Sequence, residues 1–182
     1  MNKNNSGQKG FFNSLGGERS EKADCLHRLL KSRGINFATG VPCGVLKNVI
    51  SNLLNDSEVF HVPANRESEV VGIAAGAYLS GKNPIVYMQN SGLFSASNDI
   101  ASLLIPYKIP IFFVVSYRGC EGEDAIQHLT TGRATERLLN SFNLPYEVYN
   151  QQNLGTLINR MFVHMERKKT PMTLLLKRGW EQ

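Results

Sequence analysis

Short apolar runs alternate along the chain with longer segments in which apolar residues recur every third or fourth position. The runs are bounded by Gly, Pro, Asn or Ser and predict strands, whereas the helical periodicity predicts helices. The predicted strands cover 35–39, 59–62, 84–88, 110–115, 146–149 and 172–176. The predicted helices cover 20–33, 45–54, 70–79, 95–104, 133–142 and 154–165, and a polar loop is predicted at 116–131.

This regular alternation of strand and helix indicates a three-layer α/β/α domain with a mostly parallel sheet. The run 110–115, Pro-Ile-Phe-Phe-Val-Val, has no charged or polar residue, as expected for a strand that helices cover on both faces. Residues 21–182 form the predicted domain. Residues 1–20 are rich in Asn, Gly and Ser, and we predict that they form a flexible tail.

Composition narrows the classes of protein that the chain can belong to. No apolar run approaches the roughly 18 residues of a membrane span, and the first 20 residues lack the apolar core of a signal peptide. The three cysteines form no CxxC pair or Cys/His cluster, so neither a disulfide framework nor a metal site is predicted. These features favour a cytoplasmic protein. The net charge of +5 is dispersed without a nucleic-acid-binding module, so no nucleic-acid partner is predicted.

Polar or glycine-rich residues follow four of the predicted strands, at 40–44, 65–69, 89–92 and 116–119. Parallel strands end at a common edge of the sheet, and ligands of α/β proteins bind there. Ordinary loop solvation gives a similar pattern. The dinucleotide fingerprint GxGxxG and the lysine-terminated phosphate loop are both missing from the sequence, so a nucleotide is not the predicted ligand.

Glu67 stands where the strand at 59–62 gives way to a helix of small residues. One interpretation is a first-turn acid that complements the helix dipole. The other is a carboxylate held partly out of water, whose protonation serves catalysis. The sequence pattern alone leaves both open.

Several of these segments together resemble the pyrimidine-binding domain of thiamine-diphosphate-dependent decarboxylases, most closely the phosphonopyruvate and sulfopyruvate decarboxylases. The resemblance runs from about residue 23 to 172, and Met-Gln-Asn-Ser-Gly-Leu at 88–93 is its most specific part. The other segments are Gly-Val-Pro at 40–42, Ala-Ala-Gly at 74–76, Asn98 and Arg-Gly at 118–119. In this family a glutamate nine residues before the helix glycine binds the aminopyrimidine ring, which identifies Glu67 by its distance from Gly76.

The resemblance implies a set of site residues. Thiamine diphosphate would contact Glu67, Pro42, Asn90, Ser91 and Gly92, and Glu67 and His128 would be catalytic. An anionic 2-oxo acid would contact Arg118, Gln127 and Cys43. The alternative for His128 is a loop histidine exposed to water. The alternative for Arg118 is a loop arginine that caps a nearby helix carbonyl.

The family's diphosphate-binding motif, Gly-Asp-Gly, occurs nowhere in the sequence, and Phe94 stands where the family commonly has glycine. The chain therefore resembles an alpha subunit whose partner, a beta subunit, brings Mg²⁺ and the diphosphate site. We expect a 2:2 or higher heteromer, with the helix at 95–104 in the interface. That helix carries Ile100, Leu103 and Leu104, and the alternative is that Leu103 belongs to the chain's own core.

Three functions follow. The first is the alpha subunit of a decarboxylase that converts phosphonopyruvate to phosphonoacetaldehyde or sulfopyruvate to sulfoacetaldehyde, with the substrate left open. The second is a non-catalytic partner subunit of another thiamine-diphosphate enzyme. The third is a flavodoxin-like binding module or a basic nucleic-acid binder.

Overall fold

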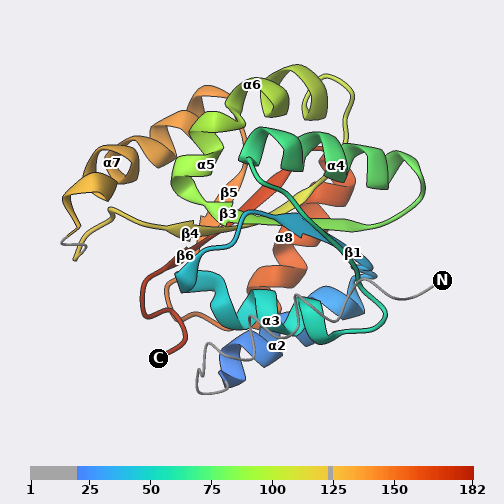
Figure 1. Ribbon diagram of the computed structural model, residues 1–182, viewed down its shortest axis with the longest axis horizontal. Coiled ribbons are helices and arrows are strands. Elements are labelled where there is room, and N and C mark those ends of the chain that lie inside the picture. Colours follow the sequence, from blue (N-terminus) through green and yellow to red (C-terminus); the bar gives the residue numbers. More distant parts are fainter. Residues whose placement is uncertain (1–19, 123–124) are drawn as a thin grey trace.

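A single six-stranded sheet forms the centre of the computed structural model, which describes residues 20–122 and 125–182 (Figure 1). Its strands are β1 (Phe37–Gly40), β2 (Phe60–Pro63), β3 (Pro84–Gln89), β4 (Phe112–Tyr117), β5 (Tyr146–Val148) and β6 (Met172–Lys177). The spatial order is β2-β1-β3-β4-β6-β5, and every neighbouring pair is parallel. The predicted parallel sheet is therefore confirmed. The tail predicted at 1–20 lies, except for Ser20, outside the described residues.

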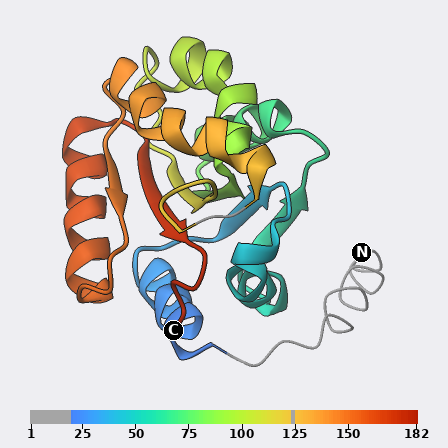
Figure 2. The ribbon, with the colours of Figure 1, turned by 90° about the vertical axis from the view of Figure 1, so that its left-hand side faces the viewer.

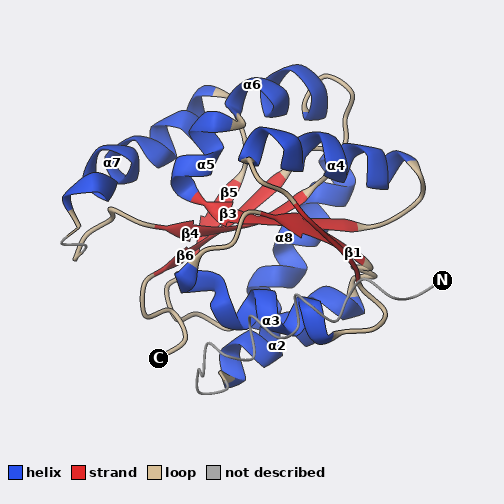
Figure 3. Cartoon of the chain, in the orientation of Figure 1, coloured by secondary structure: helices blue, strands red, loops and turns tan. Residues whose placement is uncertain are grey.

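Helices cover both faces of the sheet, as the three-layer prediction requires (Figures 1 and 3). One layer contains α2 (Glu21–Ser32), the short η1 (Gly44–Leu46), α3 (Lys47–Asn55) and α8 (Leu154–Lys168). The other contains α4 (Glu67–Leu79), α5 (Asn90–Ser95), α6 (Ser97–Asp99), the π-helical η2 (Ile100–Leu104) and α7 (Ile126–Ser141). The C-terminus returns to the first layer beside α2, where Lys22 Nζ donates to the Gln182 carbonyl (Figure 2).

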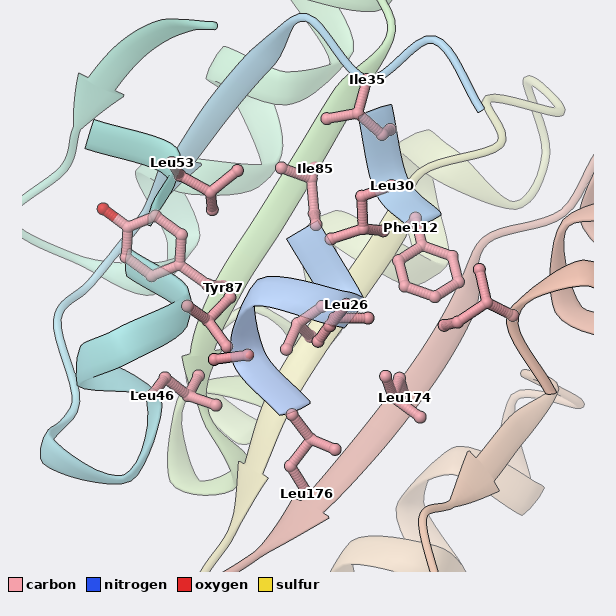
Figure 4. Close-up of a cluster of buried hydrophobic side chains, with 14 of the residues drawn as sticks. Leu26, Leu30, Ile35, Leu46, Leu53, Ile85, Tyr87, Phe112, Leu174 and Leu176 are labelled. Carbon is pink, nitrogen blue, oxygen red and sulfur yellow. The ribbon is translucent and has the colours of Figure 1, made fainter. Parts of the chain in front are cut away.

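Two apolar cores lie on opposite faces of the sheet because successive strand residues point in opposite directions. In β3, Ile85 and Tyr87 enter the core under α2, α3 and α8, whereas Val86 and Met88 enter the core under α4 and α5. Figure 4 shows the first of these cores, in which Tyr87 lies with leucine side chains from α2, α3 and β6. Burial on both faces explains why the central strands read as unbroken apolar runs.

The ends of two helices match their sequence signals. The Ser20 hydroxyl accepts a hydrogen bond from the Ala23 backbone N–H and caps α2, and Gly34, with φ +79°, follows its last turn. Asn153 caps α8 in the same way by accepting from the Thr156 N–H. These caps are local in sequence, which makes such boundaries readable without the fold.

Two helices differ from the prediction by more than three residues at their starts. The helix expected at 133–142 begins at Ile126, so Gln127 and His128 lie in its first turn and not in a loop. The buried positions of α7 include the small residues Gly132 and Thr135, which give no apolar stripe to detect. The helix expected at 95–104 begins at Asn90 and is divided into α5, α6 and η2.

The expected role of this second segment in a subunit interface is wrong for two of its residues. Ile100 and Leu104 are 2% and 0% exposed and belong to the chain's own core. Leu103 is partly buried and packs against the same core. The apolar residues of this segment were located correctly from the sequence. The segment is not one continuous helix, because α5 ends at Ala96, a residue with φ −93° and ψ 1°.

Candidate functional site

The carboxyl ends of β1 and β3 mark the point where the chain changes direction between the two layers. After β1 the chain passes to η1 and α3 in one layer, and after β3 it passes to α5 in the other. Neighbouring parallel strands whose connections diverge in this way leave room for a ligand between them. We call the region between the ends of β1 and β3 and the starts of α4 and α5, where this rule places a ligand, the switch crevice.

Glu67 is the first residue of α4 and is half-buried at this crevice. Its carboxylate forms no hydrogen bond or ion pair with any residue that the structure describes. The side chain lies against Gly92 in α5, where an added Cβ would be 2.9 Å from Oε1 and would overlap Cγ. Glycine at position 92 is therefore what lets the Glu67 side chain lie against α5.

Glu69 differs from Glu67 in that its carboxylate has a local partner. Glu69 Oε2 accepts a hydrogen bond from the Asn65 backbone N–H at 3.2 Å, just before α4 begins. Both acids lie in the first turn of α4, where a negative charge complements the helix dipole. Among the described residues the Glu67 carboxylate has no such hydrogen bond.

A chain of polar contacts continues from α5 across the ends of the central strands. Gln89, the last residue of β3, donates through Nε2 to Ser91 Oγ at 2.9 Å, and the same nitrogen is 3.4 Å from His128 Nδ1. On the other side, Cys43 Sγ is 3.9 Å from Gln89 Oε1 and 3.0 Å from Ser116 Oγ. The structure thus brings together Cys43, Ser91 and His128, which lie far apart in the sequence.

Asn90 is completely buried and joins α5 to the segment after β4. Its Nδ2 donates to the Arg118 carbonyl at 2.9 Å and to Thr135 Oγ1 at 2.8 Å, while Oδ1 accepts from the Arg118 N–H at 3.1 Å. These bonds use both amide protons of Asn90. The structure therefore gives this side chain a positioning role, and direct contact with a cofactor stays a prediction.

Two glycines hold α7 close to the same segment. Gly119 has φ +72°, and a Cβ at this residue would overlap the His128 carbonyl. A Cβ at Gly132 would overlap the backbone of Gly119. The backbone of His128 is consequently held by direct packing of one chain segment on another, which only glycine permits.

The other predicted site residues lie near the crevice with more exposure. Arg118 is bonded through its backbone to Asn90, and its side chain is partly exposed. Gln127 in the first turn of α7 and Pro42 after β1 are both exposed. Their contacts with substrate or cofactor remain predictions. Gln89 and Ser116, which link the other polar side chains, were missing from the predicted set.

His61 in β2 has a structural role. Its Nε2 is 2.6 Å from Tyr87 Oη, and the two rings stack with centroids 5.8 Å apart. Burial lowers the pKa of His61 to about 4, so the ring is neutral at neutral pH. Gly40, the last residue of β1, packs directly on the Tyr87 of this pair.

A separate depression of about 690 Å³ lies between helix α7 and the ends of β4, β5 and β6, and Gly119 is part of its wall. Its wall includes Glu136, whose two oxygens accept hydrogen bonds from the Tyr117 and Tyr146 hydroxyls at 2.9 and 2.8 Å. Burial, together with the neighbouring Glu136 carboxylate, raises the pKa of both tyrosines. Lys177 and Arg133 also line the depression.

Two features are absent from the part of the chain that the structure describes. Among residues 20–122 and 125–182, no group of three or more His, Cys, Asp or Glu side chains is arranged to hold a metal ion. In the same residues, no helix combines the length and the hydropathy needed to cross a membrane.

The fold defines a doubly wound α/β protein, and at its switch point lies Glu67, which has no partner among the described residues. No family model matches the sequence. The alpha subunit of sulfopyruvate decarboxylase from Methanothermobacter thermautotrophicus is 40% identical over 126 residues, covering 69% of this chain and 76% of that protein. The same subunit from Methanocaldococcus jannaschii is 36% identical over 151 residues, covering 82% and 89%.

A phosphonopyruvate decarboxylase from Streptomyces viridochromogenes is 31% identical over 153 residues, which is 82% of this chain but 38% of that enzyme. The chain belongs to the family of sulfopyruvate decarboxylase alpha subunits. This membership confirms the resemblance identified in the sequence. It also makes the chain a member of a decarboxylase family, against the binding-module and nucleic-acid-binder alternatives.

Proposed function

We propose that this chain is the alpha subunit of a thiamine-diphosphate-dependent decarboxylase whose substrate is sulfopyruvate, with phosphonopyruvate as the second candidate. The observation that carries the proposal is the Glu67 carboxylate, which has no partner in the described structure and lies at the switch crevice against Gly92. Sulfopyruvate comes first because the relatives that match most of their own length are named for it.

The residues at the crevice fit the pyrimidine half of the cofactor. Glu67 offers a carboxylate, and Gly92, which has no Cβ, leaves space for the Glu67 side chain. Pro42 and Ser91 stand on the β1 and β3 sides of the crevice, where they would border the bound ring. Asn90 would act by holding the wall of the crevice, through its bonds to Arg118 and Thr135.

When bound, thiamine diphosphate supplies the electron sink for loss of CO₂ from a 2-oxo acid. Glu67 would hold a proton at N1′ of the pyrimidine ring, a role for a group that can both donate and accept. His128 would hold the substrate carboxylate or deliver a proton to the product. The Arg118 guanidinium would bind the sulfonate, whose oxygens it matches in charge and geometry, and Gln127 and Cys43 would border the same substrate.

A beta subunit would supply Mg²⁺ and the diphosphate site in a 2:2 or higher heteromer. The names of the relatives support such a partner, because those that match most of their own length are alpha subunits. Closed symmetry favours an even number of each subunit.

Reconstitution tests this function. The chain would be purified alone and together with a partner chain that carries Gly-Asp-Gly, and each sample assayed for CO₂ release from sulfopyruvate, phosphonopyruvate and pyruvate. We expect release only from the pair, with the highest kcat/KM for sulfopyruvate. Equal turnover by the chain alone would overturn the shared site, and a higher kcat/KM for phosphonopyruvate would reassign the substrate.

A further inference from the structure

Gln89 occupies the centre of the polar contacts at the switch crevice. It is the last residue of β3 and is half-buried, and its amide faces side chains from three other segments. Nε2 is 2.9 Å from Ser91 Oγ in α5 and 3.4 Å from His128 Nδ1 in α7. Oε1 is 3.9 Å from Cys43 Sγ in the turn after β1.

The chemistry of the amide restricts what His128 can do. An amide nitrogen has two protons to donate and cannot accept, so the pair of contacts at Nε2 uses one proton toward Ser91 and one toward His128. Nδ1 of the neutral imidazole is then the acceptor, and the ring proton is on Nε2. Because the two ring nitrogens point in different directions, the Nε2–H is aimed away from Gln89. The 3.4 Å separation is at the long end of the range for a hydrogen bond.

The backbone of His128 is held in place independently of the contact between His128 and Gln89. Gly119 packs against the His128 carbonyl, and Gly132 packs against Gly119. What remains free is the rotation of the imidazole about its side-chain bonds and the choice of tautomer. The Gln89 amide constrains both, because its Ser91 and Cys43 contacts hold it in turn.

We propose that Gln89 is a positioning residue that holds His128 as the neutral Nε2–H tautomer, so that His128 meets the substrate as a hydrogen-bond donor. The inference rests on the proposed function for the role of His128 on a substrate. It does not depend on that function for the tautomer itself, which is a property of this chain.

Nitrogen-15 NMR of the full 182-residue chain tests the tautomer directly. Spectra recorded at about pH 8, above the ordinary pKa of imidazole, distinguish an Nε2–H from an Nδ1–H ring. His128→Asn identifies the signal by its loss. We expect wild-type His128 to be the Nε2–H form. In Gln89→Glu, which has the same size but can only accept, we expect the proton to move to Nδ1.

Matched controls separate this effect from general damage. The His27 and His61 signals, whose rings contact Asp56 and Tyr87, should be unchanged in Gln89→Glu. Gln89→Met keeps the side-chain volume without any donor, and its His128 ring should become mobile between rotamers. A wild-type His128 ring protonated at Nδ1, or a tautomer that Gln89→Glu leaves unchanged, would overturn the proposal.

The reconstituted pair tests the catalytic consequence. A group that only presents a proton acts mainly on the chemical step, so Gln89→Glu should lower kcat by roughly 10²-fold and change KM little. A tautomer shift without a fall in kcat would overturn the positioning role. If the wild-type pair releases no CO₂ while the tautomer behaves as expected, the proposed function fails and the structural part of the inference stands.

Discussion

Two carboxylates at the same edge of the sheet have opposite surroundings. Glu136, in the depression beside β4 and β5, accepts a tyrosyl hydrogen bond at each oxygen. Glu67, in the switch crevice, has no partner among the described residues and lies against Gly92. A partly buried carboxylate without partners loses solvation and gains nothing in the folded chain alone.

The difference indicates which of the two is held for stability and which for a ligand. Replacing one member of a satisfied set leaves buried partners without hydrogen bonds, so changes at Glu136 should mainly affect folding. Changes at Glu67 break no bond in the described structure and should mainly affect binding or chemistry. Four experiments test this contrast.

The largest effect is expected for Glu67→Gln. The amide keeps the size of the side chain but cannot exchange a proton, so kcat of the reconstituted pair should fall by roughly 10²–10⁴-fold. The melting temperature should not change. Glu69→Gln is the control, because Glu69 binds only the Asn65 N–H and its loss should leave kcat nearly unaltered. Equal losses of kcat in both variants would remove Glu67 from the site.

Gly92→Ala changes the position of Glu67 without altering its chemistry. The added Cβ overlaps the Glu67 side chain, and a displacement of about 1 Å can cost roughly 10² in rate. Overpacking should also lower the free energy of unfolding by about 1–3 kcal/mol. Gly72→Ala in α4 is matched to it, because a Cβ there meets nothing within 4 Å. Denaturant melts and kcat would be measured on both variants. If Gly92→Ala behaved like Gly72→Ala, the contact between Glu67 and Gly92 would be contradicted.

Glu136→Leu should lower the free energy of unfolding by about 2–3 kcal/mol, since two partly buried tyrosyl hydroxyls lose their acceptor. Once the variant is folded, kcat should remain within a few-fold of the wild type. Tyr146→Phe, which removes one donor and leaves the other, should cost about 1 kcal/mol. A Glu136 variant that is fully stable but inactive would reverse the assignment of the two carboxylates.

The smallest effect concerns His61, whose Nε2 pairs with Tyr87 Oη while its buried Nδ1 has no partner among the described residues. Its pKa of about 4 in the folded chain lies below that of a free histidine, so the unfolded chain binds more protons between the two values. Stability from this group is present above pH 6.5 and is lost as pH falls toward 4, by an amount on the order of 2 kcal/mol. Urea melts across this range should show a shallower pH dependence in His61→Gln than in the wild type.

The sequence by itself determined the strands and most of the helices. Apolar runs such as 110–115 and caps such as Ser20 depend on residues that are close in the chain, so their signals survive without the fold. The position of Glu67 before a helix of small residues made it a candidate in the same way, but its distance from Gly76 identified it only through the family resemblance.

Only the tertiary structure decided which polar residues act together. Gln89 reaches Cys43, Ser91 and His128 because parallel strands bring their ends to one edge, and nothing in the separation of these residues along the chain shows it. The early start of α7 was hidden for a related reason. Its first turns pack through Gly119 and Gly132, and backbone-to-backbone contact leaves no apolar periodicity in the sequence.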